Sequence, residues 1–390
     1  MREGWEYKKL GDVCTIERGG SPRPIADYIT ESADGINWIK IGDAVEGSKY
    51  ILFTKEKIRP EGIKKSRFVH KGDVILSNSM SFGKPYILGI DGCIHDGWLV
   101  LHDNNNTFSK DYLYYVLSSP IMYSKFTQLA VGGVVNNLNS NIVREVVVAV
   151  PPLSTQLSIV SELDKINELI RLKKEQLKDY DNLAQSIFYE MFGDPVVNEK
   201  GWDFKKIGEI GTVERGAGIS KKDFVEDGLP CIHYGQLHTI LGPTTRHHHS
   251  CIPESLLPKY KIAHTNDVIM AITSEDVEGS CKSTAWLGNY DIVIGSDAAI
   301  LHHEQDGTFL SYYTMTKAFF NEKSKYAKGF KVTHISAKEI ENIPVYLPPL
   351  ALQKDFAKRI EVIEHQKENI KSTIQDLETL LASRMQYWFD

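Results

Sequence analysis

Residues 5–20 read WEYKKLGDVCTIERGG, and residues 202–217 read WDFKKIGEIGTVERGA. Without gaps, eight of the sixteen positions are identical and six more are conservative replacements, whereas chance gives roughly one identity at typical residue frequencies. The same offset of 197 residues returns where PPL at 151–153 with Gln156 matches PPL at 348–350 with Gln353. The chain of 390 residues is therefore a tandem repeat, with a shared scaffold and a divergent interior.

Each repeat begins with a segment that predicts a mixed α/β domain, over residues 1–150 and 199–347. Short apolar runs such as GDVILS at 72–77 and NDVIMAI at 266–272 are separated by Gly, Pro and Asn, which is typical of strands and turns. Helical patterns are sparse, and one candidate helix runs from 109 to 125. We therefore expect a mixed sheet with few helices in each domain.

Each repeat ends with a long helix, over residues 151–198 and 348–390. Apolar residues recur there at alternating spacings of three and four, interrupted at Lys173 and Lys367. This period predicts a coiled-coil seam between two antiparallel helices, although each helix could instead pack on its own domain. The expected fold is two α/β (α+β) domains joined by two long antiparallel coiled-coil helices, with pseudo-two-fold symmetry. The predicted seam consists of Leu163, Ile166, Ile170, Leu177, Ile360, Ile363, Ile370, Ile374 and Leu377.

The composition excludes several classes of protein. Apolar residues make up 42% and charged residues 25% of the chain, which is ordinary for a globular protein. The sequence shows neither a secretory leader nor an apolar stretch of the roughly 18 residues that a membrane helix needs. Five cysteines are scattered and odd in number, which indicates no disulfide framework. We expect a reduced, cytoplasmic protein.

No catalytic or metal-binding motif is recognisable. Both PP dipeptides are followed by Leu rather than by the aromatic residue of amino-methyltransferase motifs, and there is no phosphate-binding loop. The spacing Glu6-Tyr7-Lys8 is shared with Asp203-Phe204-Lys205, so we interpret it as scaffold rather than as a nuclease site. Three histidines at 247–249 near Cys251 favour a solvated loop over a metal site. We predict no catalysis, metal or cofactor in this chain, with a magnesium-dependent nuclease as the alternative.

Two basic stretches stand out against a net charge of −6. Residues 49–71 carry eight basic and two acidic residues, and residues 317–331 carry five lysines against Glu322. Such stretches suit the neutralisation of DNA phosphates, which positions a protein without reading sequence. A solubilising surface remains the alternative for each stretch.

Forked donors and amides on exposed loops can read the edges of bases. Arg18 and Arg215 are equivalent across the repeat, which indicates a role in the scaffold or at phosphate. Asn137 and His334 occupy matching positions but differ chemically, as two readers of different sequences should. Roles in turns and caps are the alternative for each residue. The predicted DNA-binding residues are Arg18, Ser21, Arg23, Lys64, Lys65, Arg67, Asn78, Asn136, Asn137, Asn139, Arg215, Lys221, Lys222, His233, Gln236, Lys328, Lys331 and His334.

The doubled motifs resemble the specificity subunits of type I restriction-modification systems over essentially the whole chain. The resemblance rests on the WxxKK[LI]G[DE][VI] segments at Trp5 and Trp202, the ERG turn, the DVI strand, PPLxxQ, and MFGD at 191–194. It implies that residues 1–150 and 199–347 are target-recognition domains, each binding one half of a bipartite, asymmetric DNA site. Residues 151–198 and 348–390 would be spacer helices that fix the gap.

The resemblance also implies the partners of the chain. Two adenine methyltransferase subunits would dock on it and carry S-adenosylmethionine, and restriction subunits with motor and nuclease activity would join for cleavage. The chain itself would be a non-catalytic subunit. A coiled-coil scaffold protein with two ligand-binding heads is the alternative function.

Overall fold

The structure is a computed structural model that describes residues 2–45, 47–78, 82–130, 138–255, 260–327 and 332–390. The chain forms two compact units. Unit 1 comprises Met1–Lys174 with Ser372–Asp390, and unit 2 comprises Glu175–Lys371. In the described ranges, no helix is both long and apolar enough to cross a membrane.

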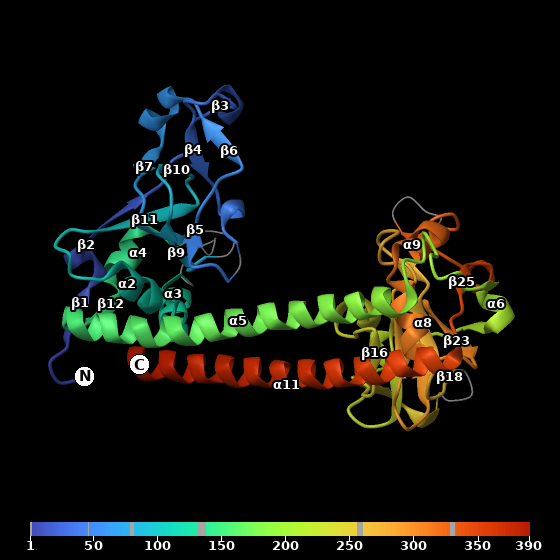
Figure 1. Ribbon diagram of the computed structural model, residues 1–390. Helices are drawn as coiled ribbons and strands as arrows, with labels where there is room; N and C mark the ends of the chain where they lie inside the picture. The colour runs from blue at the N-terminus through green and yellow to red at the C-terminus, as the bar shows by residue number, and fades with distance from the viewer. Residues whose placement is uncertain (1, 46, 79–81, 131–137, 256–259, 328–331) are drawn as a thin grey trace. The chain divides into compact units, whose positions relative to one another are not determined.

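Unit 1 is built on two sheets and one short strand pair (Figure 1). The central sheet has the order β2 (Cys14–Arg18), β11 (Trp98–Asp103), β8 (Val74–Ser77), β9 (Pro85–Leu88) and β5 (Tyr50–Ile51). The outer sheet has the order β3 (Ile29–Thr30), β6 (Glu56–Ile58), β4 (Ile36–Ile39), β10 (Gly92–Ile94) and β7 (Arg67–Val69). The pair is β1 (Glu6–Lys9) with β12 (Val147–Val150).

The central sheet is buried on both faces, because alternate residues contribute to two different cores. Val74 and Leu76 belong to the core that includes the helices, whereas Ile75 between them belongs to the core shared with the outer sheet. Successive strand residues point to opposite faces, so a strand covered on both sides is a continuous apolar run. This is why GDVILS shows no alternation. The predicted mixed sheet is thus two sheets, packed together through residues such as Trp98.

The helices of unit 1 cover the other face of the central sheet. The predicted helix over 109–125 is two helices, because Pro120 lacks an N–H and can only begin a helix. Ser109 caps the first one by accepting the N–H of Tyr112. The short helices are α1 (Leu10–Val13), α2 (Lys110–Ser118), α3 (Pro120–Ala130), α4 (Ser140–Glu145), and the 3₁₀ turns η1 (Ile25–Asp27), η2 (Ile41–Asp43) and η3 (Pro60–Lys65).

Unit 2 repeats this architecture with the same strand order in its central sheet, while in its outer sheet an isolated bridge between Val225 and Cys251 replaces the pairing of β3 with β6. Its central sheet is β14 (Gly211–Arg215), β23 (Ala298–His303), β19 (Val268–Ala271), β21 (Ser283–Trp286) and β16 (Thr244–Thr245). Its outer sheet is β17 (Ser250–Ile252), β15 (Leu229–Ile232), β22 (Ile292–Ile294) and β18 (Lys261–Ala263). The remaining strands are β13 (Phe204–Lys206) with β25 (Pro344–Tyr346) and β20 (Thr273–Ser274) with β24 (Thr333–His334). The short helices are α6 (Ile207–Ile210), η4 (Lys221–Asp223), α7 (Tyr234–Thr239), α8 (Gly307–Thr314), α9 (Lys317–Lys323) and α10 (Ala337–Glu341).

A buried glutamine attaches each long helix, α5 (Leu153–Phe192) and α11 (Leu350–Phe389), to its domain. Gln156 Oε1 accepts the backbone N–H of Ser109 at 2.8 Å, and its amide donates to the backbone oxygens of Thr107 and Pro151. Gln353 repeats this arrangement in unit 2: its Oε1 accepts the backbone N–H of Asp306 at 3.0 Å. The PPLxxQ motif therefore recurs because its glutamine side chain connects the start of the long helix with a loop of the domain and with the end of the preceding strand.

Within each unit, α5 and α11 lie side by side and antiparallel (Figure 1). In unit 1, Arg384 binds Glu162, and Lys174 Nζ lies 2.9 Å from Glu378 Oε1. In unit 2, Lys367 Nζ lies 2.7 Å from Asp181 Oδ1. Of the predicted seam, Leu177 and Leu377 are half-buried, and the remaining seven residues are buried: Leu163, Ile166, Ile170, Ile360, Ile363, Ile370 and Ile374.

Candidate nucleic-acid interface

The Glu-Arg-Gly turn frames an arginine identically in the two units. Arg18 is the last residue of β2, and Arg215 is the last residue of β14. The next residue must be glycine, because a Cβ on Gly19 or on Gly216 would lie 2.2 Å from a backbone oxygen of the facing turn. The close approach of two backbones thus explains the repeated ERG sequence.

In unit 1, the turn before β11 gathers three of the predicted DNA-binding residues. Arg18 Nε donates to the backbone oxygen of Asp96 at 2.8 Å, and Asn78 Nδ2 donates to the same oxygen at 3.0 Å. Ser21 Oγ donates to Asp96 Oδ1 at 2.8 Å. Arg18 nevertheless remains exposed. The hydrogen bond fixes Arg18 at its Nε atom. The side chain remains exposed, as a contact with a DNA phosphate or a nucleobase requires.

The charge state of this cluster follows from its surroundings. Burial opposes ionisation of Asp96, but the hydrogen bond from Ser21 and the nearby His95, Arg18 and Arg23 together lower its pKa. Burial lowers the pKa of His95, which lies 2.9 Å from Asp96 Oδ1. At neutral pH the cluster therefore contains a carboxylate and a neutral imidazole. Arg23 is exposed beside them.

The other cationic candidates of unit 1 make different contacts. Lys65 Nζ donates to the Tyr28 hydroxyl at 2.7 Å, and Arg67 Nη1 lies 3.2 Å from Glu17 Oε1. Lys64 is exposed at the end of η3. Lys64 and Lys65 therefore suit phosphate better than Arg67, whose charge is already compensated.

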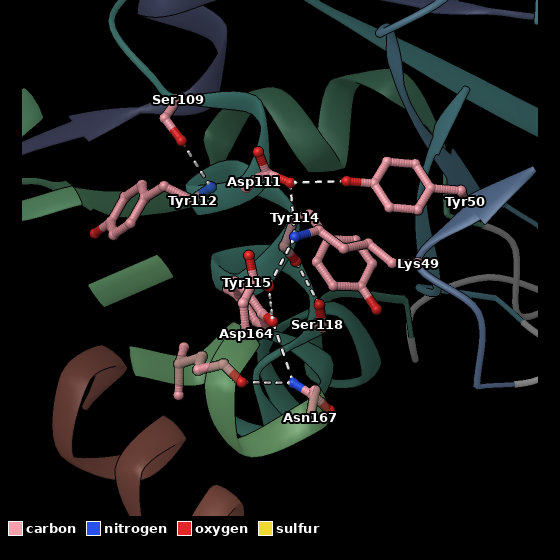
Figure 2. A network of polar contacts seen from close by, with 11 residues as sticks. Lys49, Tyr50, Ser109, Asp111, Tyr112, Tyr114, Tyr115, Ser118, Asp164 and Asn167 are labelled. Atoms are coloured by element: carbon pink, nitrogen blue, oxygen red, sulfur yellow. Dashed lines mark hydrogen bonds and ion pairs between the residues drawn. The ribbon is translucent and has the colours of Figure 1, made fainter. Parts of the chain in front are cut away.

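The basic stretch 49–71 does not act as one surface, because Lys49 points inward. Figure 2 shows Lys49 between two carboxylates: its Nζ lies 2.6 Å from Asp111 Oδ1 and 3.0 Å from Asp164 Oδ1. Tyr115 also donates its hydroxyl to Asp164. Burial alone lowers the pKa of Lys49, but the two carboxylates outweigh it and raise the pKa. Lys49 thus fastens the domain to α5 instead of meeting phosphate.

In unit 2, a threonine and an aspartate connect two of the predicted residues. Arg215 Nη2 lies 3.6 Å from Asp297 Oδ1, which also accepts a hydrogen bond from Thr273 Oγ1 at 3.2 Å. Thr273 Oγ1 lies 3.3 Å from His334 Nδ1. Arg215 and His334 therefore belong to one cluster, beside the turn that is equivalent to the Arg18 turn of unit 1.

A second group of unit 2 surrounds a cavity of about 860 Å³. His233 caps α7. Its ring Nδ1 accepts the backbone N–H of Gly235 at 3.2 Å, and its backbone N–H donates to Gln236 Oε1 at 2.9 Å. Burial, together with Lys221, lowers the pKa of His233. The neutral ring therefore carries its proton on Nε2 and is a hydrogen-bond donor. The cavity is lined, among others, by Lys221, His233, Gln236, His238, Thr273 and Lys282.

The remaining candidates have varied placements. Lys222 is exposed beside Lys221, and Asn139 caps α4 by accepting the N–H of Ile142 at 3.0 Å. Within the second basic stretch, Lys323 is buried and donates to the backbone oxygens of Glu278 and Ser280. Asn136, Asn137, Lys328 and Lys331 lie outside the described residues. Over the described ranges, no group of three or more His, Cys, Asp or Glu residues is placed to hold a metal ion.

Sequence reasoning missed Asp96, Asp297 and Thr273, which organise the two clusters. The strand registers show that Asp297 of unit 2 is equivalent to Gly97 of unit 1, and not to Asp96. Because the two aspartates come from different positions of the same turn, alignment of the repeats gives no signal for them.

Two homologous α/β domains, each followed in the chain by a long helix, define a tandem-repeat protein. The family model of the type I restriction modification DNA specificity domain matches residues 2–179 and 199–379, and the chain belongs to this family.

Relatives of known name support this assignment. The chain is 23% identical over 418 residues to the type I restriction enzyme MjaVIII specificity subunit of Methanocaldococcus jannaschii, covering 98% of this chain and 92% of the relative. It is 21% identical over 188 residues to the EcoKI specificity subunit of Escherichia coli K12, covering 47% and 40% of the two chains.

Solved structures share the fold. A chain from work on complex assembly and conformational transition of the type I R-M system superposes with a TM-score of 0.61 at 20% identity, covering 99% of this chain and 97% of that chain. The type I restriction-modification S subunit from M. genitalium superposes with a TM-score of 0.56 at 13% identity, covering 99% and 96%. At these identities the likeness concerns the fold alone.

Proposed function

We propose that this chain is the non-catalytic specificity subunit of a type I restriction-modification complex, and that each unit reads one half of a bipartite, asymmetric DNA site. One observation carries the proposal: the two units share the turn that presents an arginine, but different side chains, from different positions along the chain, surround that arginine. Arg18 and Arg215 leave the same turn, but the first is accompanied by Ser21 and Asn78 and the second by Thr273 and His334. Equivalent frames with different donors suit two different half-sites.

The side chains of unit 2 favour particular base atoms. His233 has a fixed N–H donor, which suits the N7 or O6 of guanine, the N7 of adenine or the O4 of thymine. Arg215 is exposed at the matching turn, where it suits either phosphate or guanine. Lys64 and Lys65 in unit 1 and Lys221 and Lys222 in unit 2 supply the positive charge for the DNA backbone.

The long helices supply a surface for partner subunits. Leu153 and Leu350 are equivalent in the repeat and exposed, and so are Leu183 and Leu380. Exposed apolar residues at equivalent positions suit two copies of one partner. We assign this role to two adenine methyltransferase subunits that carry S-adenosylmethionine, joined by restriction subunits for cleavage. In the complex, α5 and α11 set the gap between the half-sites, since each helix of 40 residues is about 60 Å long.

Methylation mapping tests the proposed function. The chain is expressed with the methyltransferase subunit of its own system in a host without such enzymes, and the DNA is read by single-molecule sequencing. We expect one split motif, methylated at adenine in both halves and separated by a fixed gap. The control expresses the methyltransferase subunit alone and should yield no motif. A folded complex that leaves the DNA unmethylated would contradict the proposal and favour a scaffold with two ligand-binding heads.

A further inference from the structure

The loop that follows β19 in unit 2 is longer than the equivalent loop after β8 in unit 1. A backbone hydrogen bond of 2.7 Å closes each loop: Gly83 N donates to Ser77 O, and Cys281 N donates to Ala271 O. Both closing residues have a positive φ, 78° at Gly83 and 55° at Cys281. Five residues, 78–82, lie inside the first closure, and nine residues, 272–280, lie inside the second. We name the second segment the long loop.

The long loop begins inside the candidate nucleic-acid interface. Thr273 pairs with His334 where β20 and β24 run antiparallel. Thr273 Oγ1 donates to Asp297 Oδ1 at 3.2 Å, and the same carboxylate oxygen is the partner of Arg215. The backbone of the long loop therefore continues directly from the cluster that surrounds Arg215.

Hydrogen bonds inside the long loop order its backbone. Asp276 Oδ1 accepts the backbone N–H of Gly279 at 2.7 Å, and Ser280 Oγ donates to the backbone oxygen of Val277 at 2.7 Å. A Cβ on Gly279 would lie 2.3 Å from Oγ and 3.3 Å from Cβ of the buried Ser274. The two ends of the loop thus approach so closely that glycine is favoured at position 279.

A buried lysine contacts the long loop from the core side. Lys323 of α9 is 4% exposed, and its Nζ donates to the backbone oxygen of Glu278 at 2.8 Å and to that of Ser280. Burial lowers the pKa of Lys323, although the nearby Cys281, Glu278 and Asp276 oppose this effect. A buried cation is costly unless it is hydrogen-bonded, and charge-assisted hydrogen bonds are roughly twice as strong as neutral ones. Lys323 therefore fastens the loop to α9.

Unit 1 has a phenylalanine where unit 2 has this lysine. The two helix starts are equivalent, because Ser119 and Thr316 each accept the backbone N–H three residues further on at 3.3 Å. Seven residues after these caps stand Phe126 in unit 1 and Lys323 in unit 2. Phe126 is fully buried, and a Cβ on Gly83 would lie 3.4 Å from its ring. The domain fold itself thus needs no cation at this position, and the cation accompanies the longer loop.

The side chains of the long loop suit the reading of bases better than the binding of phosphates. The loop exposes three carboxylates, those of Glu275, Asp276 and Glu278. Carboxylates repel DNA phosphates, but they can accept hydrogen bonds from the exocyclic amino groups of bases. Glu275 lines the same cavity as His233, and Lys221 and Lys282 line it as well, so cations for phosphate stand beside the loop.

We propose that the long loop reads bases of the half-site bound by unit 2, and that Lys323 is a positioning residue that holds this loop without touching DNA. This inference rests on the proposed function, which places DNA at the cluster around Arg215. Because unit 1 has Phe126 at the equivalent position, only one of the two half-sites depends on a buried lysine. Loss of Lys323 should therefore affect discrimination in one half-site and leave the other unchanged.

Methylation of a pooled DNA library tests the positioning role. The full-length chain with Lys323→Met is assembled with the methyltransferase subunit and given sites that differ from the recognised site by one base. We expect methylation of sites with a wrong base in the unit 2 half-site to rise about tenfold relative to the intact site, since one mismatch typically costs about that factor or more. Sites with a wrong base in the unit 1 half-site should stay as poorly methylated as before. Replacing residues 1–150 with the domain of a related specificity subunit identifies the half-site of unit 1.

Lys325→Met is the matched control. Lys325 lies two residues further along the chain and forms an exposed pair with Glu322 at 2.6 Å. This variant should discriminate against wrong bases in both half-sites as the unaltered chain does. A second variant, Asp276→Ala, removes the exposed side chain that binds the N–H of Gly279, outside the core. It should relax the unit 2 half-site in the same way, even if Lys323→Met does not fold.

Three outcomes would overturn the inference. The first is unchanged discrimination by a folded complex with Lys323→Met, and the second is equal relaxation of both half-sites. The third is unchanged discrimination by Asp276→Ala. If the unaltered chain and the methyltransferase subunit together methylate no split motif, the proposed function itself is wrong.

Discussion

The two units fasten their domains to the long helices with differently placed cations. In unit 1, Lys49 comes from the domain and lies partly buried between Asp111 of α2 and Asp164 of α5. Unit 2 has Pro243 at this position, as the matching strand pairing shows: Ile87 N donates to Lys49 O, and Ala285 N donates to Pro243 O.

Unit 2 takes its cations from elsewhere. Arg246 Nη2 lies 2.6 Å from Glu361 Oε1 on α11, in an exposed pair. Lys367 of α11 itself is buried and lies 2.8 Å from Glu364 Oε1, which also accepts a hydrogen bond from Tyr312. Burial alone lowers the pKa of Lys367, but the two neighbouring carboxylates, Asp181 foremost, raise it. Both units pair a cation with carboxylates at a long helix, but the cation stands at a different sequence position in each unit. The buried glutamine, in contrast, is the same in both units.

The largest effect should come from the shared glutamine. Gln156→Leu leaves a backbone N–H and two backbone oxygens without their partner. Gln353→Leu leaves a backbone N–H, one backbone oxygen and the side-chain oxygen of Gln305 without theirs. We expect each to lower the free energy of unfolding by about 3 kcal/mol, because unsatisfied buried groups keep their full desolvation cost. Urea unfolding measures the loss. Thr155→Leu, at the half-buried residue directly before Gln156, is the control for unit 1. Clearly unequal losses of unfolding free energy in the two variants would show that the two glutamines do not have the same role.

A smaller and one-sided effect should follow from Lys49→Met. The change leaves Asp111 and Asp164 without their cation, and we expect unit 1 to lose about 1–2 kcal/mol, since both carboxylates are partly exposed. Unfolding followed by hydrogen exchange should show the loss in α2 and the first half of α5, with unit 2 unchanged. Lys55→Met removes an exposed lysine of the same stretch and should have no effect. Equal destabilisation by both variants would show that Lys49 has no anchoring role.

The smallest effect concerns pH. Asp73 raises the pKa of His102, so the protonated histidine stabilises unit 1. This contribution is fully present below the pKa of the unfolded chain, about 6.5, and is lost as pH rises through the higher pKa of the folded protein. We expect the difference in stability between the unaltered chain and His102→Gln to shrink between pH 6 and pH 8. Its size is below about 1 kcal/mol, because the pair is partly exposed. A difference that grows with pH would contradict this assignment.

Much of the fold could be predicted because residue spacing and short sequence motifs determine it. The repeat and the long helices follow from spacing alone. Seven of the nine predicted seam residues are buried, and three of these, Leu163, Ile360 and Ile363, belong to the cores of the domains. The two remaining ones, Leu177 and Leu377, are half-buried. The ERG and PPLxxQ motifs mark positions where backbone approach and buried hydrogen bonds admit few side chains.

The candidate site depended on tertiary structure, because its charges act through neighbours that are distant in sequence. The sequence predicts Lys49 and Lys323 as free surface cations. In the structure, Lys49 pairs with two carboxylates, and Lys323 is buried and donates to two backbone oxygens. Asp96 and Asp297 organise their clusters from different positions of one turn. The sequence by itself determined the repeated scaffold, since periodicity and packing are local. Only the folded chain decided which charged side chains are paired or buried and which stay exposed, since pairing and burial are properties of the assembled surface.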